Sequence, residues 1–115
     1  AASDVYKRQE LDTTYTRGVE LLQKRKYAKA LYILNDYNDR NTVVAHLSMD
    51  HNERAMELLA TMPKDAVTEY LRAIACSRLG RKAEGREHFL EACRLDGRME
   101  YRGNLDPEIA ELLKQ

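Results

Sequence analysis

The sequence predicts an all-α domain built from pairs of short helices. Apolar residues return every three or four positions along most of the chain, as they do in amphipathic helices, and the alternation that marks strands is absent. Only two prolines and five glycines interrupt the 115 residues. Pro63, Gly80 and Gly97 fall where apolar periods end, so they divide the chain into helical segments joined by short turns.

The composition limits the class of protein. A chain of 115 residues is long enough for one domain with a modest hydrophobic core. Nineteen basic side chains balance nineteen acidic ones, which argues against nucleic-acid binding because phosphate recognition needs a basic surplus. No apolar run approaches the roughly 20 residues that cross a bilayer, so we expect no direct membrane insertion of this segment. Residues 1–9 fit no later pattern; we expect a disordered or non-native leader there and a single domain over residues 10–115.

The first two helix pairs are indicated by their apolar positions. Val19 and Leu22 mark the first helix, the basic run 24–26 is expected to be a solvated turn, and Ala30 and Leu34 share a face of the next helix. The second pair is shorter and degenerate, and Pro63 ends it. Its apolar positions are Val43, Val44, Leu47, Ala55, Leu58, Leu59 and Met62.

The third pair is the most regular part of the sequence. Asp65 is placed to cap its first helix, Gly80 supplies the left-handed turn that ends this helix, and a second helix is expected over residues 81–96. Asp106 and Pro107 then indicate the start of a last helix, because Asp caps helices and Pro fits their first turn. The expected buried face of that helix comprises Ile109, Leu112 and Leu113.

Residues 70–96 resemble a tetratricopeptide repeat. Ala73 matches the family's small residue on the first helix, Gly80 its turn, Phe89 its large second-helix residue and Ala92 the small residue that follows. The sequence departs from the family pattern at two positions, where Gly85 replaces an alanine and Gly97 the closing proline.

The resemblance implies an architecture for the whole domain. It covers roughly residues 12–96 and implies a right-handed α-solenoid of about three two-helix repeats, the middle one degenerate, with a C-terminal capping helix. The alternative is an irregular helical bundle in which the periodicity arises by chance.

The same resemblance implies a binding surface, because the first helices of such repeats line a concave groove. Tyrosine and arginine are favoured in binding hot spots, whereas Val44 and Ile74 are at least as well explained as core residues. We do not expect the clamp with which some family members hold a terminal carboxylate, since only Asn41 fits it. The candidate groove residues are Tyr15, Val19, Arg40, Val44, Tyr70, Ile74 and Arg78.

No pattern in the sequence points to catalysis, a cofactor or a metal. His46 and His51 are five residues apart, which places them about 140° apart around an ideal helix, and His88 is expected to be a solvated imidazole. Cys76 and Cys93 form no Cys-x-x-Cys motif and are expected to be buried thiols. A nucleophile needs a base within hydrogen-bond reach, and no motif supplies one, so we expect a chain that is not an enzyme.

A narrower resemblance concerns the C-terminal region. Residues 101–109, Tyr-Arg-Gly-Asn-Leu-Asp-Pro-Glu-Ile, look like part of the helical tail of Bacteroidetes OmpA-like envelope proteins associated with fimbria-type surface structures. This resemblance implies a periplasmic or envelope-associated bacterial protein; without it we expect a cytoplasmic one. The function predicted first is a protein-interaction scaffold that binds a protein or peptide partner in its groove, and the alternative is a structural domain of a larger envelope protein.

Overall fold

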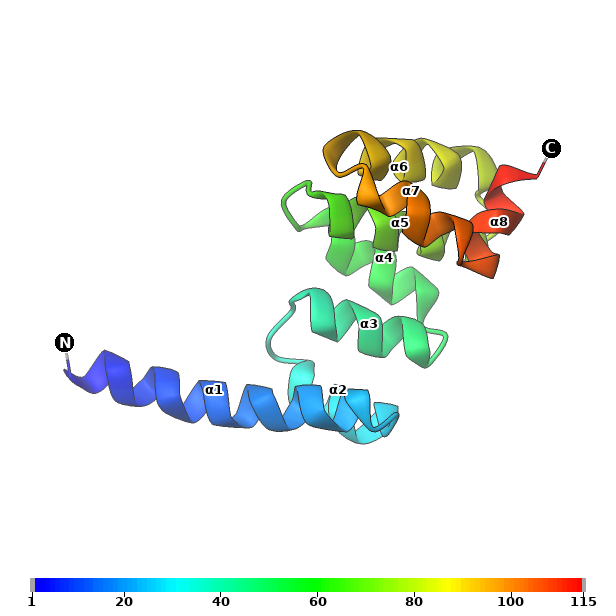
Figure 1. Cartoon of the computed structure of the whole chain (residues 1–115). Helices are drawn as coiled ribbons and strands as arrows, with labels where there is room; N and C mark the ends of the chain where they lie inside the picture. Colours follow the sequence, from blue (N-terminus) through cyan, green and yellow to red (C-terminus); the bar gives the residue numbers. More distant parts are fainter. Residues whose placement is uncertain (1, 115) are drawn as a thin grey trace. The chain divides into compact units, whose positions relative to one another are not determined.

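The computed structural model of the chain describes the backbone of residues 2–114 and the side chains of residues 13–114. The described backbone forms eight α-helices and no strand, which confirms the all-α prediction (Figure 1). The chain divides into two compact units, Ala1–Asp50 and His51–Gln115, and each is described by itself.

The first unit contains α1 (Ala2–Gln23), α2 (Tyr27–Leu34) and α3 (Arg40–Ser48). Helix α2 folds back beside α1 and also packs against α3 (Figure 1). Helix α1 includes the backbone from Ala2 onward. The side chains of residues 1–9 lie outside the described residues, so the leader expected there stays a prediction. The buried apolar residues of this unit include Ala30, Leu34, Val43, Ala45 and Leu47.

Helix α3 begins with a reciprocal cap. The carboxylate of Asp39 accepts a hydrogen bond from the backbone N–H of Thr42 at 3.1 Å, and the Thr42 hydroxyl oxygen accepts one from the backbone N–H of Asp39 at 3.4 Å. The same Thr42 hydroxyl donates to the carbonyl of Leu34 at 2.7 Å. The end of α2 and the start of α3 are therefore joined through one buried side chain.

The second unit contains α4 (Asn52–Ala60), α5 (Ala66–Arg78), α6 (Lys82–Leu95), α7 (Arg98–Asn104) and α8 (Pro107–Leu113). The α5–α6 hairpin is its centre, with α4 packed on α5 and with α8 packed on both α5 and α6 (Figure 1). Asp65 and Asp106 cap α5 and α8 as predicted. Helix α7 was not predicted, because its buried residues Met99 and Gly103 form only a single i, i+4 pair.

One turn recurs three times, immediately before α2, α4 and α6. Each turn contains one residue with positive φ, namely Arg25 (61°), Asp50 (60°) and Gly80 (77°). The next residue then has φ between −92° and −85° and ψ between 61° and 68° in every case, and the helix follows it; these residues are Lys26, His51 and Arg81. Three helix pairs thus share one connection, although only the third has the glycine that favours it.

The residues that follow these turns are also equivalent. Five positions after the left-handed residue stands a buried small residue, Ala30, Ala55 or Gly85, and nine positions after it stands a large buried one, Leu34, Leu59 or Phe89. This register makes the fold helical and repeat-like. The left-handed residues are 25 and 30 positions apart, so each helix-pair repeat is shorter than the roughly 34 residues of a tetratricopeptide repeat.

Candidate binding surface

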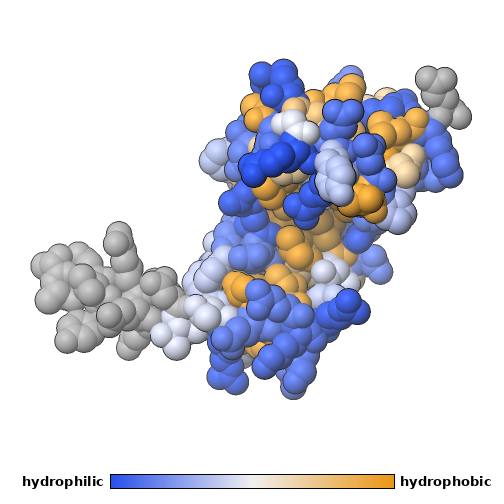
Figure 2. All heavy atoms as spheres, in the orientation of Figure 1, coloured by the Kyte–Doolittle hydropathy of each residue, from blue (hydrophilic) through white to orange (hydrophobic). Residues whose placement is uncertain are grey.

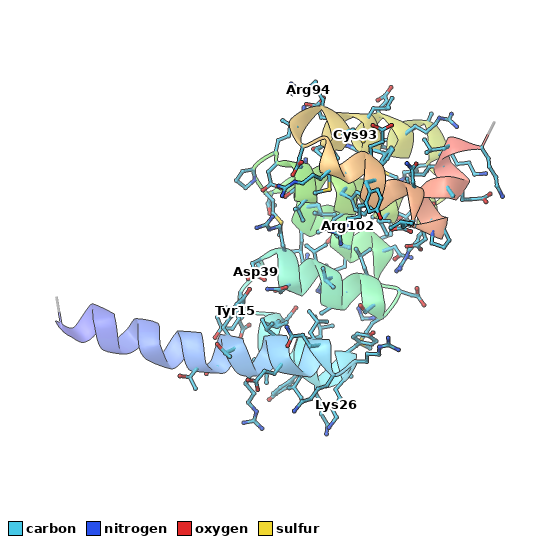
Figure 3. All side chains as sticks on the ribbon, viewed as in Figure 1. Tyr15, Lys26, Asp39, Cys93, Arg94 and Arg102 are labelled. Atoms are coloured by element: carbon cyan, nitrogen blue, oxygen red, sulfur yellow. The ribbon has the colours of Figure 1, made fainter. Side chains whose placement is uncertain are left out.

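The predicted groove positions of the first unit are partly engaged in packing. The Tyr15 ring lies 5.1 Å from the Tyr37 ring, and its hydroxyl accepts a hydrogen bond from the amide of Asn41. Partial burial and a hydrogen bond to Asp39 raise the pKa of Tyr15, and Figure 3 shows these two side chains together beside α3. Asn41, the single residue that suited a carboxylate clamp, is therefore already paired with a tyrosine of its own chain.

The remaining groove positions of this unit are more accessible. Arg40 is exposed at the start of α3, while Val19 and Val44 are half-buried. Arg40 and Tyr15 therefore retain some exposed surface, as predicted, and the two valines contribute partly to packing.

The groove positions of the second unit are covered by the C-terminal helices. Tyr70 is 3% exposed; its hydroxyl donates to Asp106 at 2.8 Å, and its ring lies 6.2 Å from Phe89 and 5.0 Å from the guanidinium of Arg102. Ile74 is also buried. Tyr70 is thus a core residue of this unit, contrary to its expected exposure.

Arg78 is exposed but bound to the same C-terminal segment. Its Nε donates to the Glu108 carboxylate at 2.6 Å, and the neighbouring Ser77 hydroxyl donates to the Glu108 carbonyl at 3.1 Å. Helix α8 therefore occupies the face of α5 on which a ligand was expected.

Among the side chains that the structure describes, the most exposed large apolar one lies elsewhere, on α2. Tyr32 is 88% exposed and stands between two shallow hollows that share Ala28 and Tyr32 as lining residues. The first hollow is also lined by Leu31, Asn35, Asp36 and Met49, and the second by Arg17, Leu21, Lys26, Lys29 and Ile33. We call this region the Tyr32 surface.

The Tyr32 surface combines apolar walls with a basic edge. Helix α2 is apolar on more than its buried side, since Leu31 and Ile33 are only half-buried around the exposed tyrosine. Arg17, Lys26 and Lys29 supply three positive charges to one hollow, and Lys26 lies at the basic turn between α1 and α2 (Figure 3). The turn itself is exposed, as predicted, because residues 24–26 face solvent. Sequence periodicity missed this surface because it assigned α2 a single apolar face.

The cysteines and histidines take more varied positions than expected. Cys76 is buried, and burial together with the nearby Glu84 carboxylate raises the pKa of its thiol to about 11, which makes it a poor nucleophile at neutral pH. Cys93 is only half-buried.

His88 was expected to be solvated, but its Nδ1 lies 2.7 Å from Oε2 of the buried Glu69, so that expectation is wrong. His51 occupies the turn before α4, as predicted, and is exposed.

Charge and apolar surface elsewhere are dispersed. Figure 2 shows polar and charged atoms over most of the visible surface of the second unit, with apolar atoms between them near the C-terminal end. Exposed apolar residues there include Leu105 and Leu113. Within the part of the chain that the structure describes, no helix combines the length and apolar character needed to span a membrane.

Comparisons with models of protein families, with curated proteins and with solved structures find no match to this chain.

Proposed function

We propose that the chain is a non-catalytic protein-interaction domain of tetratricopeptide-like helical repeats, arranged as a right-handed solenoid of about three pairs with a C-terminal cap. The recurring left-handed turn and the equivalent small and large residues after it support the repeat assignment. Because the left-handed residues are only 25 and 30 positions apart, the helix pairs are compact variants of the family's repeat.

The observation that carries the binding proposal is the Tyr32 surface. Tyr32 presents an aromatic ring at 88% exposure between two hollows with apolar lining, and an exposed tyrosine beside apolar pockets is a typical binding hot spot. Arg17, Lys26 and Lys29 at its edge favour a partner with acidic residues. The occupant we propose is an amphipathic peptide segment that pairs apolar anchors with Asp or Glu.

The predicted groove differs between the two units. Arg40 is exposed, whereas the equivalent face of α5 is closed by α8 through Arg78 and Ser77. Binding is therefore proposed on the first unit, and Tyr70 and Ile74 support the fold of the second unit instead of contacting a partner.

The test is a peptide-display selection against the full chain, followed by affinity measurement of the selected peptides. Tyr32→Ala should weaken binding by about tenfold or more, and Lys26→Glu/Lys29→Glu should weaken acidic peptides selectively. Tyr101→Ala is the matched control, because Tyr101 is 72% exposed on the other unit. Circular dichroism should show unchanged helicity in all variants, since every changed side chain is exposed.

Selected peptides without acidic residues, or equal affinities for the parent chain and the Tyr32 variant, would remove this surface from consideration. Backbone amide shifts on peptide addition locate the site independently. They should change in α2 and at the turn before it, and changes confined to α5 and α8 would contradict the proposal.

A second candidate function is a structural domain of a larger envelope protein. The observation that favours it is the packing of α8 on α5, in which Ile109 and Leu112 of α8 are fully buried. In that case the selection yields no peptide that binds the Tyr32 surface, and the substitutions at Tyr32, Lys26 and Lys29 leave peptide binding unchanged from the parent chain.

A further inference from the structure

The seam between α5 and α6 brings together four side chains with metal-binding or carboxylate chemistry. Glu69 and Cys76 are seven residues apart on α5 and so share a face, as do Glu84 and His88, four apart on α6. One donor atom from each of Cys76, Glu84 and His88 lies within 4.8 Å of the others. Among the described residues, no other cluster of three such groups is this close.

The orientation of His88 is fixed by a buried carboxylate. Its Nδ1 lies 2.7 Å from Oε2 of Glu69, a residue only 2% exposed, while the other Glu69 oxygen pairs with Arg72. Arg72 is held in turn by the carbonyl of Met62 at 3.2 Å. With Nδ1 engaged, the remaining nitrogen, Nε2, lies 3.8 Å from Oε1 of Glu84. A carboxylate on one nitrogen of a histidine commonly orients the other nitrogen toward a metal.

We propose that Cys76, Glu84 and His88 bind a divalent ion of the zinc class, with Glu69 as the positioning residue behind His88. Thiolate, imidazole and carboxylate are the ligands that zinc prefers. Donor atoms around tetrahedral zinc are about 3.3–3.6 Å apart, so the three atoms must close by little more than about 1 Å.

Charge and access agree with this assignment. Binding of the ion would displace the proton of the Cys76 thiol, and the resulting thiolate and the Glu84 carboxylate together balance a dication. Glu69 is already balanced by Arg72. Glu84 is about half exposed and His88 a quarter exposed, so solvent reaches the cluster from the α6 side and a water can complete the coordination. The ion would tie the two helices of the third pair together beside their connecting turn.

Cobalt(II) titration of the reduced, metal-free full chain tests the site directly. Thiolate coordination gives a near-ultraviolet charge-transfer band, and tetrahedral geometry gives intense visible bands. We expect one equivalent of Co²⁺ to produce both, and Zn²⁺ to displace it and raise the thermal midpoint of the chain.

Five variants, one of them a control, separate this site from adventitious binding. Cys76→Ala should abolish the charge-transfer band, whereas Cys93→Ala, the matched control at the other free cysteine, should retain it. His88→Gln and the exposed Glu84→Gln should each weaken Co²⁺ binding by at least about tenfold with folding unchanged. Glu69→Gln should weaken binding by about 10–100-fold but preserve the thiolate band.

A charge-transfer band that persists without Cys76 or disappears with Cys93 would overturn the proposal. So would a stoichiometric band that is unaffected by His88→Gln and Glu84→Gln, or no charge-transfer band in the folded parent chain. These spectra are independent of peptide binding at the Tyr32 surface, which is on the other unit.

Discussion

Two glycines of the C-terminal segment sit in opposite environments, and this difference predicts opposite responses to alanine. A Cβ on Gly103 would overlap the ring carbons Cε1 and Cζ of Phe89, a buried residue, and would lie 3.1 Å from Cγ2 of Ile109. A Cβ on Gly97 would meet nothing within 4 Å. Gly103→Ala should therefore destabilise the chain by about 1–3 kcal/mol, because the aromatic ring must move in a packed core.

The control for this change is Gly97→Ala, whose helical φ of −58° suits alanine and which should be neutral or stabilise by up to about 1 kcal/mol. Urea unfolding followed by circular dichroism measures both variants. Equal stability of the two would show that α7 does not pack against Phe89 in solution.

The Tyr70 hydroxyl should make the stability of the folded chain sensitive to alkaline pH. Burial, and then the hydrogen bond to Asp106, raise the pKa of Tyr70 above its ordinary value near 10. An acid with a higher pKa in the folded state holds its proton longer there than in the unfolded chain. The stabilisation is therefore fully present below about pH 10 and is lost as the pH rises toward the folded-state pKa.

Tyr70→Phe is the comparison that isolates this group, because every other side chain is the same in the two proteins. At neutral pH the variant should be less stable by about 1–2 kcal/mol, since it lacks the hydrogen bond to a carboxylate. The difference should shrink as the pH rises above about 10, because the parent chain then loses stability. Unfolding curves that remain parallel across this range would contradict the assigned role of the hydroxyl.

At the residue scale, the sequence indicated the caps better than the turns. Asp65 and Asp106 were recognisable because each precedes an apolar period and caps helices through a short side chain. The left-handed Arg25 and Asp50 were not, because neither residue indicates positive φ as strongly as glycine does at Gly80. Their equivalence appears only when backbone angles are compared across the three turns.

Helix α8 provides a prediction at the scale of elements, since it has only seven residues and is too short to be stable alone. Its order must come from packing: Leu112 is fully buried next to Gly85, whereas its neighbour Leu113 is 43% exposed. Leu112→Ala should cost about 2–5 kcal/mol, while Leu113→Ala should cost less than about 1 kcal/mol.

Thermal unfolding of the two variants compares the same chemical change one residue apart. Similar losses would mean that α8 is not fixed in the register described. A large loss confined to Leu112→Ala would support α8 as an integral cap of α5 and α6.

The cap also explains why the binding site was harder to predict than the helices. Periodicity identified the helical segments other than α7, because the buried faces repeat along the sequence. Periodicity could not show that Arg78 would pair with Glu108, or Tyr70 with Asp106, because polar pairs that are about 30 residues or more apart leave no periodic pattern in the sequence. The same limit concealed the pairing of Glu69 with His88, and with it the cluster at Cys76.

At the scale of the whole molecule, each compact unit has its own buried apolar residues, which predicts that damage to one core spares the other. Leu34 is fully buried in the first unit and Leu112 in the second. Leu34→Ala should lower the amide hydrogen-exchange protection of α2 and α3, and Leu112→Ala that of α5, α6 and α8.

The two leucines form a matched pair for this experiment, because the same atoms are removed from equally buried positions. Peptide-resolved exchange should show each loss confined to its own unit, and the costs should be additive in the double variant within about 0.5 kcal/mol. Loss of protection across both units from either single change would instead indicate one cooperative stack, as strong coupling between neighbouring repeats would produce. If each change affects only its own unit, a peptide bound at the Tyr32 surface should stabilise the first unit and leave the hydrogen exchange of α5 and α6 unchanged. Hydrogen exchange measured with and without the peptide tests this directly.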